Sequence, residues 1–347
     1  MTGLMAYSGI TTKIRAMQKN LLTDAQFREI TSLPDVPSIV SWLKKVPSYA
    51  DVLSHLDENN LHRGQIEFEI GNATYSDFAS IYQFANGAQR KFLREYGRRF
   101  EVKLLKRCMN AAINGSQMTP DIKVYKDFFD HYTELDLDAL YEAKDIRAVI
   151  DALKGTHYYE PLNRISQNPG MTLFDYETAL DQYYFAQIWD DRGGMKTKLN
   201  TSIITKIFGT KIDMLNLIWI NRARNHYHMS AADMYAMLIP ISYKLKKEEV
   251  QALVEADSSD AYESALKKTY FGRVYKNYMA PENLGSEYNY VLRHILNKLS
   301  REDPYSVATL HNYLYLKEHE IARLTIAVEC VRYGMPSDEA MKLILAL

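Results

Sequence analysis

Apolar residues recur every three or four positions along most of the chain. Near the start, Ile10, Ile14 and Met17 follow this spacing, which places them on one face of a helix. Alternation with period two, the pattern of a half-buried strand, is isolated in residues 65–70 and ends at a Gly-Asn pair. We interpret that segment as a helix start or a short extended stretch. The pattern therefore predicts an all-α protein.

Proline and glycine divide this helical pattern into short pieces. Both residue types interrupt regular helices, so their clusters mark the connections between elements. They gather at residues 33–37, 115–116, 167–170, 192–194 and 280–285. The sequence therefore predicts an array of helices separated by turns.

Three groups of residues recur in the same order, and we call them the first, second and third anchors. The first is a leucine with an apolar residue five positions later and a mostly apolar one eight positions later: Leu22, Phe27, Ile30; Leu135, Leu140, Ala143; and Leu245, Val250, Leu253. The second is a Leu-Lys pair followed by an aromatic residue: Leu43, Lys44, Tyr49; Leu153, Lys154, Tyr158, Tyr159; and Leu266, Lys267, Tyr270, Phe271. The third is an acidic residue with aliphatic neighbours one and four positions later, which we interpret as a helix start: Glu101, Asp213 and Glu320.

The spacing between anchors is nearly constant. First and second anchors lie 18 to 21 residues apart, which is room for two short helices and a turn, and second and third anchors lie 54 to 60 residues apart. Solenoid repeats have periods of about 20 to 50 residues, whereas these repeats are domain-sized. We therefore predict three similar helical lobes, in residues 1–118, 119–235 and 236–347.

The third-anchor acids and a set of arginines are the charged residues that the repeat singles out. A carboxylate near a helix start is favourable because the helix dipole is positive there, so we expect the acids to be structural. Arginines toward the far ends of the same helices suit the negative end of the dipole, or bind carboxylates of a partner protein. The candidate partner-binding residues are Arg107, Arg222, Arg224 and Arg332.

Motifs for catalysis are missing from the sequence. It has no GxxxxGK(S/T), GxGxxG, HExxH or GxSxG pattern. Asp190 and Asp191 resemble the acidic pair of helical prenyl-transfer enzymes, but Gly194 stands where that motif needs a third carboxylate, so we expect a solvated turn. We therefore assign no catalytic residue, cofactor-binding residue or metal ligand, and predict that the protein is not an enzyme.

Bulk charge and cysteine content exclude other classes. The 42 basic and 43 acidic residues leave a net charge of -1, so the basic surface typical of nucleic-acid binding is not expected. The two cysteines, Cys108 and Cys330, form no CxxC pair, and we expect both to be buried thiols. No run approaches the roughly 20 apolar residues of a membrane span, so any membrane contact is expected to be peripheral.

Three stretches resemble the C subunit of the V/A-type ATPases, called the d subunit in eukaryotes. Residues 314–334 read LYLKEHEIARLTIAVECVRYG, which is similar to the KExEIxxLxxIxExxxxG region of that family. Residues 174–185, FDYETALDQYYF, match its ExALDxxYF segment, and residues 7–17, YSGITTKIRAM, match its opening. The resemblance covers the chain nearly from end to end.

This resemblance implies a fold and a mechanical role. It implies a funnel of three helical lobes about a pseudo-threefold axis, seated as a monomer on the proteolipid ring of a rotary ATPase at the cytoplasmic face of the membrane. Shaft subunits D and F would enter its cavity. The chain would then be a non-catalytic coupler that transmits torque for H+ or Na+ transport.

Two other hypotheses remain open from the residues alone. The first is an all-helical enzyme for a small molecule, acting at His226, His228 and Asp233. Two histidines two positions apart on a helix point in nearly opposite directions, which argues against a shared metal. The second is a helical scaffold unrelated to ATPases.

Overall fold

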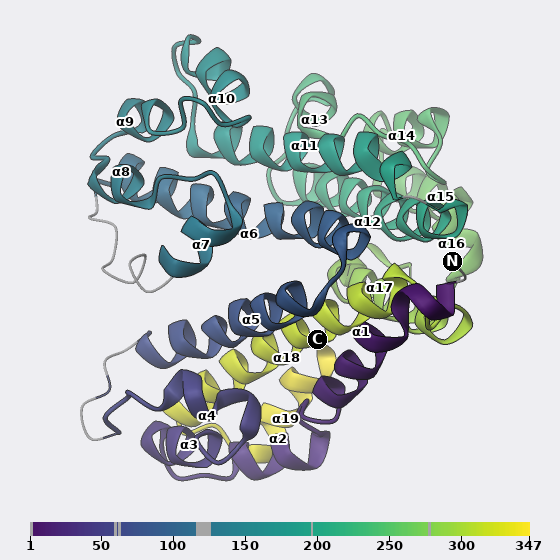
Figure 1. The fold of residues 1–347 in the computed structure, drawn as a ribbon. Coiled ribbons are helices and arrows are strands. Elements are labelled where there is room, and N and C mark those ends of the chain that lie inside the picture. Colours follow the sequence, from purple (N-terminus) through teal and green to yellow (C-terminus); the bar gives the residue numbers. More distant parts are fainter. Residues whose placement is uncertain (1–2, 59–60, 62–63, 116–125, 196, 277–278) are drawn as a thin grey trace. The chain divides into compact units, whose positions relative to one another are not determined.

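Helices form all the regular secondary structure that the computed structural model describes, which covers residues 3–58, 61, 64–115, 126–195, 197–276 and 279–347 (Figure 1). The α-helices are α1 (Gly3–Gln18), α2 (Asp24–Thr31), α3 (Val36–Leu43), α4 (Pro47–Leu53), α5 (Gln65–Phe84), α6 (Gly87–Ile113), α7 (Lys126–Tyr132), α8 (Leu137–Glu142), α9 (Ile146–Asp151), α10 (Tyr159–Ser166), α11 (Leu173–Asp191), α12 (Lys198–Asn225), α13 (Ala231–Met237), α14 (Lys247–Val254), α15 (Ser259–Lys268), α16 (Tyr270–Val274), α17 (Leu284–Glu302), α18 (Val307–Arg332) and α19 (Ser337–Ala346). Two 3-10 helices, η2 (Arg192–Gly194) and η3 (Pro281–Asn283), lie at predicted breaker sites. The all-α prediction is confirmed, and residues 65–70 are a helix start.

Along the described part of the chain, a series of three short helices and two long ones occurs three times. The series are α2 to α6, α8 to α12 and α14 to α18. Each predicted segment, 1–118, 119–235 and 236–347, contains one series, and the two short helices predicted between the first and second anchors are present each time. The arrangement of three lobes about an axis stays a prediction.

The second short helix of each series begins in the same way, which gives the repeat a local cause. The residue eight positions before the second-anchor leucine is an N-cap whose side chain accepts a hydrogen bond from a backbone N–H three residues on. These caps are Asp35, Asp145 and Ser258, with donor distances of 2.8, 2.8 and 3.2 Å. Such caps satisfy one of the unpaired N–H groups at a helix start and fix its position.

The chain divides into two compact units, which we call the chain-end unit and the middle unit. The chain-end unit contains residues 1–90 and 296–347, and the middle unit contains residues 91–295. The chain-end unit thus combines the first four helices of the first series with the last helices of the third.

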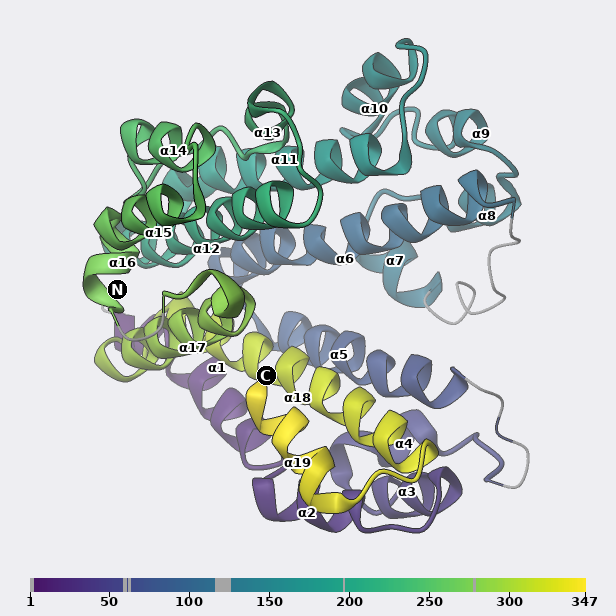
Figure 2. The ribbon, with the colours of Figure 1, turned by 180° about the vertical axis from the view of Figure 1, so that it is seen from behind.

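In the chain-end unit, α18 is the central element. It lies alongside α5 and α1 and packs on α2, α3 and α19, as Figures 1 and 2 both show. Over the length of α18, which is described throughout, Ala322 is the one exposed residue. The apolar side chains of this helix complete a core to which both ends of the chain contribute, including Ile30, Leu43, Ile70, Leu324, Val328 and Ile344.

In the middle unit, α12 is the central helix of one core cluster, as α18 is in the chain-end unit. Its apolar residues pack with those of α13 to α17. Among them are Met214, Leu217, Leu245, Leu253, Leu266 and Phe271, several of which are anchor residues. The repeated leucines are buried because they pack the short helices against a long one.

Candidate functional site: three buried acids

The third-anchor acids lie in the middle of long helices, and the prediction that they open helices is wrong. Glu101 is in α6, Asp213 in α12 and Glu320 in α18, each at least a dozen residues from the helix start. Their exposed fractions are 9%, 0% and 4%. An acid followed by aliphatic residues one and four positions later has the same spacing inside a long helix as at its beginning, so the pattern alone did not locate the start.

Glu320 receives hydrogen bonds from the first and second anchors of the first series. The backbone N–H of Leu22 donates to one carboxylate oxygen, and the Tyr49 hydroxyl donates to the other at 2.5 Å. Leu22 immediately precedes the N-cap of α2, and Tyr49 is in α4. The carboxylate thereby ties both short helices to the middle of α18.

Lys317, one turn before Glu320, supplies the compensating charge. Its side chain has no exposed surface, and its Nζ lies 2.9 Å from Glu320, 3.8 Å from Asp77 of α5 and 4.1 Å from the centre of the Tyr49 ring. The Tyr313 hydroxyl donates to Asp77 at 2.6 Å. Burial raises the pKa of Asp77 against the opposing effect of the Lys317 charge. A buried ammonium needs such partners because isolated charges are very costly away from water.

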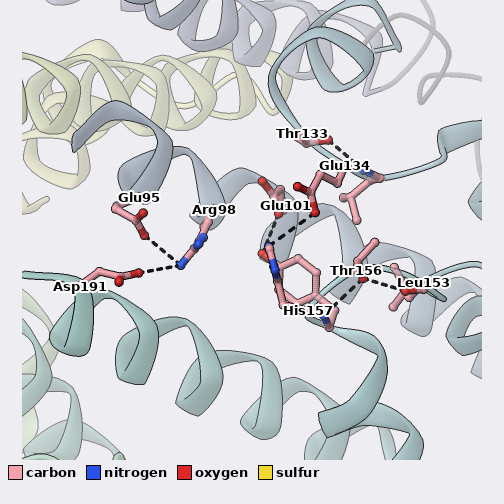
Figure 3. Close-up of polar contacts among 11 residues, drawn as sticks. Glu95, Arg98, Glu101, Thr133, Glu134, Leu153, Thr156, His157 and Asp191 are labelled. Atoms are coloured by element: carbon pink, nitrogen blue, oxygen red, sulfur yellow. Dashed lines mark hydrogen bonds and ion pairs between the residues drawn. The ribbon is translucent and has the colours of Figure 1, made fainter. Parts of the chain in front are cut away.

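Glu101 is held in a similar way in the middle unit. The Tyr158 hydroxyl, from the second anchor of the second series, donates to it at 2.8 Å. Arg98 occupies the place that Lys317 has before Glu320, but it pairs with Glu95 at 2.9 Å and Asp191 at 3.4 Å, lying between the two carboxylates in Figure 3. Burial raises the pKa of Glu101, and the Tyr158 hydrogen bond opposes that shift.

Asp213 is held by backbone groups instead. The N–H groups of Tyr243, Lys244 and Leu245 donate to its carboxylate at 3.1, 2.6 and 2.9 Å. Burial raises the pKa of Asp213 to about 6, although these three hydrogen bonds act in the other direction. The Tyr243 ring packs directly on Gly209, one turn earlier in α12, where a β-carbon would overlap it.

The three acids connect successive series. Glu101 ends the first series and binds an anchor of the second, and Asp213 ends the second and binds an anchor of the third. Glu320 ends the third and binds anchors of the first. The pairing is therefore cyclic, and the sequence repeat did not reveal it because the anchors of one repeat bind partners in another.

The four candidate arginines fall into two groups. Arg107 and Arg222 are exposed. Arg332 pairs with Glu67 at 2.6 Å and with Glu329, while Arg224 donates to the carbonyl of Ser258 at 3.2 Å and lies over the Tyr262 ring. Three of them are in the last turn of their helix, as predicted, but α6 continues past Arg107 to Ile113. Their role in partner binding stays a prediction.

The remaining predicted residues are placed as follows. Cys108 and Cys330 are buried, as predicted. The expected turn at Asp190 and Asp191 is wrong, since both residues end α11 and Asp191 pairs with Arg98. Asp233 interacts with Ser230 at the start of α13.

His226 and His228 follow the end of α12, and His228 has a positive φ of 48°. Within the described ranges, no group of three or more His, Cys, Asp or Glu side chains is arranged to hold a metal ion. None of the helices described there has the length and apolar character needed to cross a membrane.

Comparison with known proteins gives the family of the chain. The family model described as ATP synthase (C/AC39) subunit matches residues 10–343. The chain therefore belongs to the ATP synthase C/AC39 subunit family of the A- and V-type rotary ATPases.

Curated relatives match over most of their length. The C subunit of the A-type ATP synthase of Methanobrevibacter smithii is 25% identical over 96% of this chain and 87% of its own length. The protein of the same description from Methanothermobacter thermautotrophicus is 24% identical over 97% and 87%, and that of Thermococcus kodakarensis is 23% identical over 96% and 88%. The similarity thus extends over nearly the whole chain at modest identity.

Proposed function

We propose that this chain is the non-catalytic central-stalk coupler of a rotary V/A-type ATPase. In this proposal it connects a shaft of subunits D and F to the proteolipid ring and transmits torque between ATP turnover and H+ or Na+ transport. It acts as a single copy within the complex, at the cytoplasmic face of the membrane. Its three segments, residues 1–118, 119–235 and 236–347, form lobes about a pseudo-threefold axis.

The observation that carries this proposal is the family match over residues 10–343, together with relatives of comparable length that are named as the C subunit of A-type ATP synthases. A coupler performs no chemistry, so its strongest requirement is resistance to deformation under load. Close-packed helical cores have low compressibility and transmit strain.

The buried acids support that requirement. In addition to the apolar packing, Glu320 and Asp213 fix short helices to the middle of a long helix through two or three hydrogen bonds each. Hydrogen bonds to an ionised group are stronger and more directional than contacts between apolar side chains. Their role in this proposal is to keep the repeats rigid.

Two exposed arginines are the proposed contacts with partner subunits. Arg107 and Arg222 are exposed on their helices, whereas Arg224 and Arg332 contact neighbouring groups of the chain. An exposed guanidinium binds a carboxylate of another protein with two parallel hydrogen bonds at little desolvation cost. We therefore assign Arg107 and Arg222 to the partner surface and give Arg224 and Arg332 a lesser part in it.

The test is binding of purified chain to purified D–F shaft and, separately, to detergent-solubilised ring from the source organism. Retention of the shaft, the ring or both is the expected result. R107E and R222E should each weaken binding at least about tenfold, because each substitution removes a charge-assisted contact with the partner. The matched control is R164E, a charge reversal at another exposed arginine on α10. Failure of folded wild-type protein to bind either partner would contradict the coupler and favour an unrelated scaffold.

A further inference from the structure

The chain-end unit has no complete core until both ends of the chain are present. Residues 1–90 supply α1 to α5, and residues 296–347 supply the buried faces of α18 and α19 against them. Core positions such as Ile30, Leu43 and Ile70 are closed by Leu324 and Val328. Separation of the two segments would expose apolar residues on both of them at once.

Several buried polar contacts between the two segments gather around one lysine. Lys317 and Glu320 come from α18, whereas Asp77 comes from α5 and Tyr49 from α4. One ammonium therefore serves two carboxylates, and two hydroxyls complete their hydrogen bonds. Every contact of this cluster across the segments is broken if α18 leaves α4 and α5.

A buried group of this kind behaves differently from an apolar core. Its charges regain hydration when the segments separate, so it adds little net stability while requiring an accurate closed geometry. Removal of one member leaves an uncompensated charge inside, which strongly favours opening. These properties suit a contact that is either fully closed or fully open.

We propose that Asp77, Lys317 and Glu320 form a clasp between the two ends of the chain, and that the chain-end unit opens as one cooperative piece while the middle unit stays folded. Cooperative opening of part of a protein at lower free energy than global unfolding is common where a unit has its own core. The middle unit, residues 91–295, has such a core around α12. This device is independent of the coupler proposal and holds for the isolated chain.

Segment-resolved hydrogen exchange of full-length K317M tests the clasp. Methionine keeps the apolar stem of lysine but removes the charge, so exchange should accelerate on the order of a hundredfold throughout residues 3–58, 64–90 and 296–347. Exchange in the described part of residues 91–295 should be unchanged. The control is K267M, at an exposed lysine of α15 that pairs with Glu263 at 3.3 Å, and it should change neither unit.

The triple variant D77N/K317M/E320Q distinguishes charge from packing. It carries the same methionine without the two stranded carboxylates, so it should recover much of the lost protection. An exchange increase confined to residues 313–320, or one spread evenly over both units, would overturn the clasp. So would a triple variant that is as open as K317M.

Native-state exchange of the unmodified protein covers the case in which K317M does not fold. Over a series of guanidinium concentrations, amides of the chain-end unit should merge into one opening transition at lower denaturant than those of the middle unit. A single transition shared by all protected amides would overturn the proposal.

Discussion

Glu320 and Asp213 occupy corresponding places in the repeat but are stabilised in different ways. Glu320 pairs with a buried lysine and accepts from a tyrosine hydroxyl, whereas Asp213 accepts from three consecutive backbone N–H groups. The longer glutamate side chain reaches Tyr49 of α4, and the shorter aspartate side chain binds the connection that precedes α14. The aromatic anchor of the third series, Tyr270 and Phe271, is not among the donors to Asp213.

This difference shows that the repeat preserves an architecture rather than a chemical group. In both places a carboxylate holds the segment before a short helix against the middle of a long one. The Lys317 site depends on charge balance, while the Asp213 site depends on the course of the backbone. Mutations of side chains should therefore affect the two sites unequally.

Truncation before Leu314 should have the largest effect. It removes most of α18 and all of α19, and with them the residues that close the core of the chain-end unit. Because a typical domain is stable by only roughly 5–15 kcal/mol, this unit should not fold without them. Thermal unfolding followed by circular dichroism should show a lost or much lower transition. An unchanged midpoint would show that α18 is dispensable.

Glu320→Gln should be the most harmful single change in the comparison. It leaves the Lys317 charge without its nearest counterion in a fully buried place, for an expected loss of about 3–5 kcal/mol. Chemical denaturation with a probe in the chain-end unit measures it. The matched control is Glu263→Gln, a half-exposed partner of Lys267, which should cost less than about 1 kcal/mol. Equal losses in the two variants would contradict the importance of burial.

The pH dependence of stability should distinguish the wild type from the variant Asp213→Asn. Because burial raises the pKa of Asp213 to about 6, the folded state holds its proton at pH values where the unfolded chain has lost it. The Asp213 contribution to stability is therefore greatest below about pH 4 and declines by about 3 kcal/mol as the pH rises past 6. Urea unfolding at pH 4 to 7.5 should show that decline in the wild type and not in the variant. Parallel curves would mean that the three N–H donors keep the pKa low.

Gly209→Ala should have the smallest effect of the four. The added β-carbon meets the Tyr243 ring, so the ring and the segment that donates to Asp213 must shift. Overpacking of this kind costs about 1–3 kcal/mol. The control is Gly71→Ala in α5, where the β-carbon meets open space and alanine should stabilise the helix slightly. Urea unfolding compares them, and equal stability of both variants would contradict the close approach.

The sequence predicted the helices and the anchor leucines well because both depend on local periodicity. It also showed that Glu101, Asp213 and Glu320 occupy equivalent positions of the repeat. It placed them at helix starts, however, because nothing in the local spacing distinguishes the middle of a long helix from its beginning. The partners Leu22 and Tyr49 of Glu320 lie almost the whole chain away, and such pairing is not encoded by periodicity.

Lys317 illustrates a second limit of the sequence. It lies in the family motif, but its charge gave no sign of complete burial, since lysines are rarely buried unless paired. Its partner Asp77 lies on α5, outside every anchor. The sequence did contain a further signal for the helix starts, because an Asp or Ser stands eight residues before each second-anchor leucine. These residues are the caps Asp35, Asp145 and Ser258.

A measurement of coupling between ATP hydrolysis and ion transport tests the proposed role directly. The measurement is ATP-driven ion transport by the complex reconstituted in vesicles, with this chain omitted and then added back, beside ATP hydrolysis in the same samples. Hydrolysis should persist without the chain while transport stops, and the added chain should restore transport. Transport that continues undiminished in the absence of the chain would contradict the coupler.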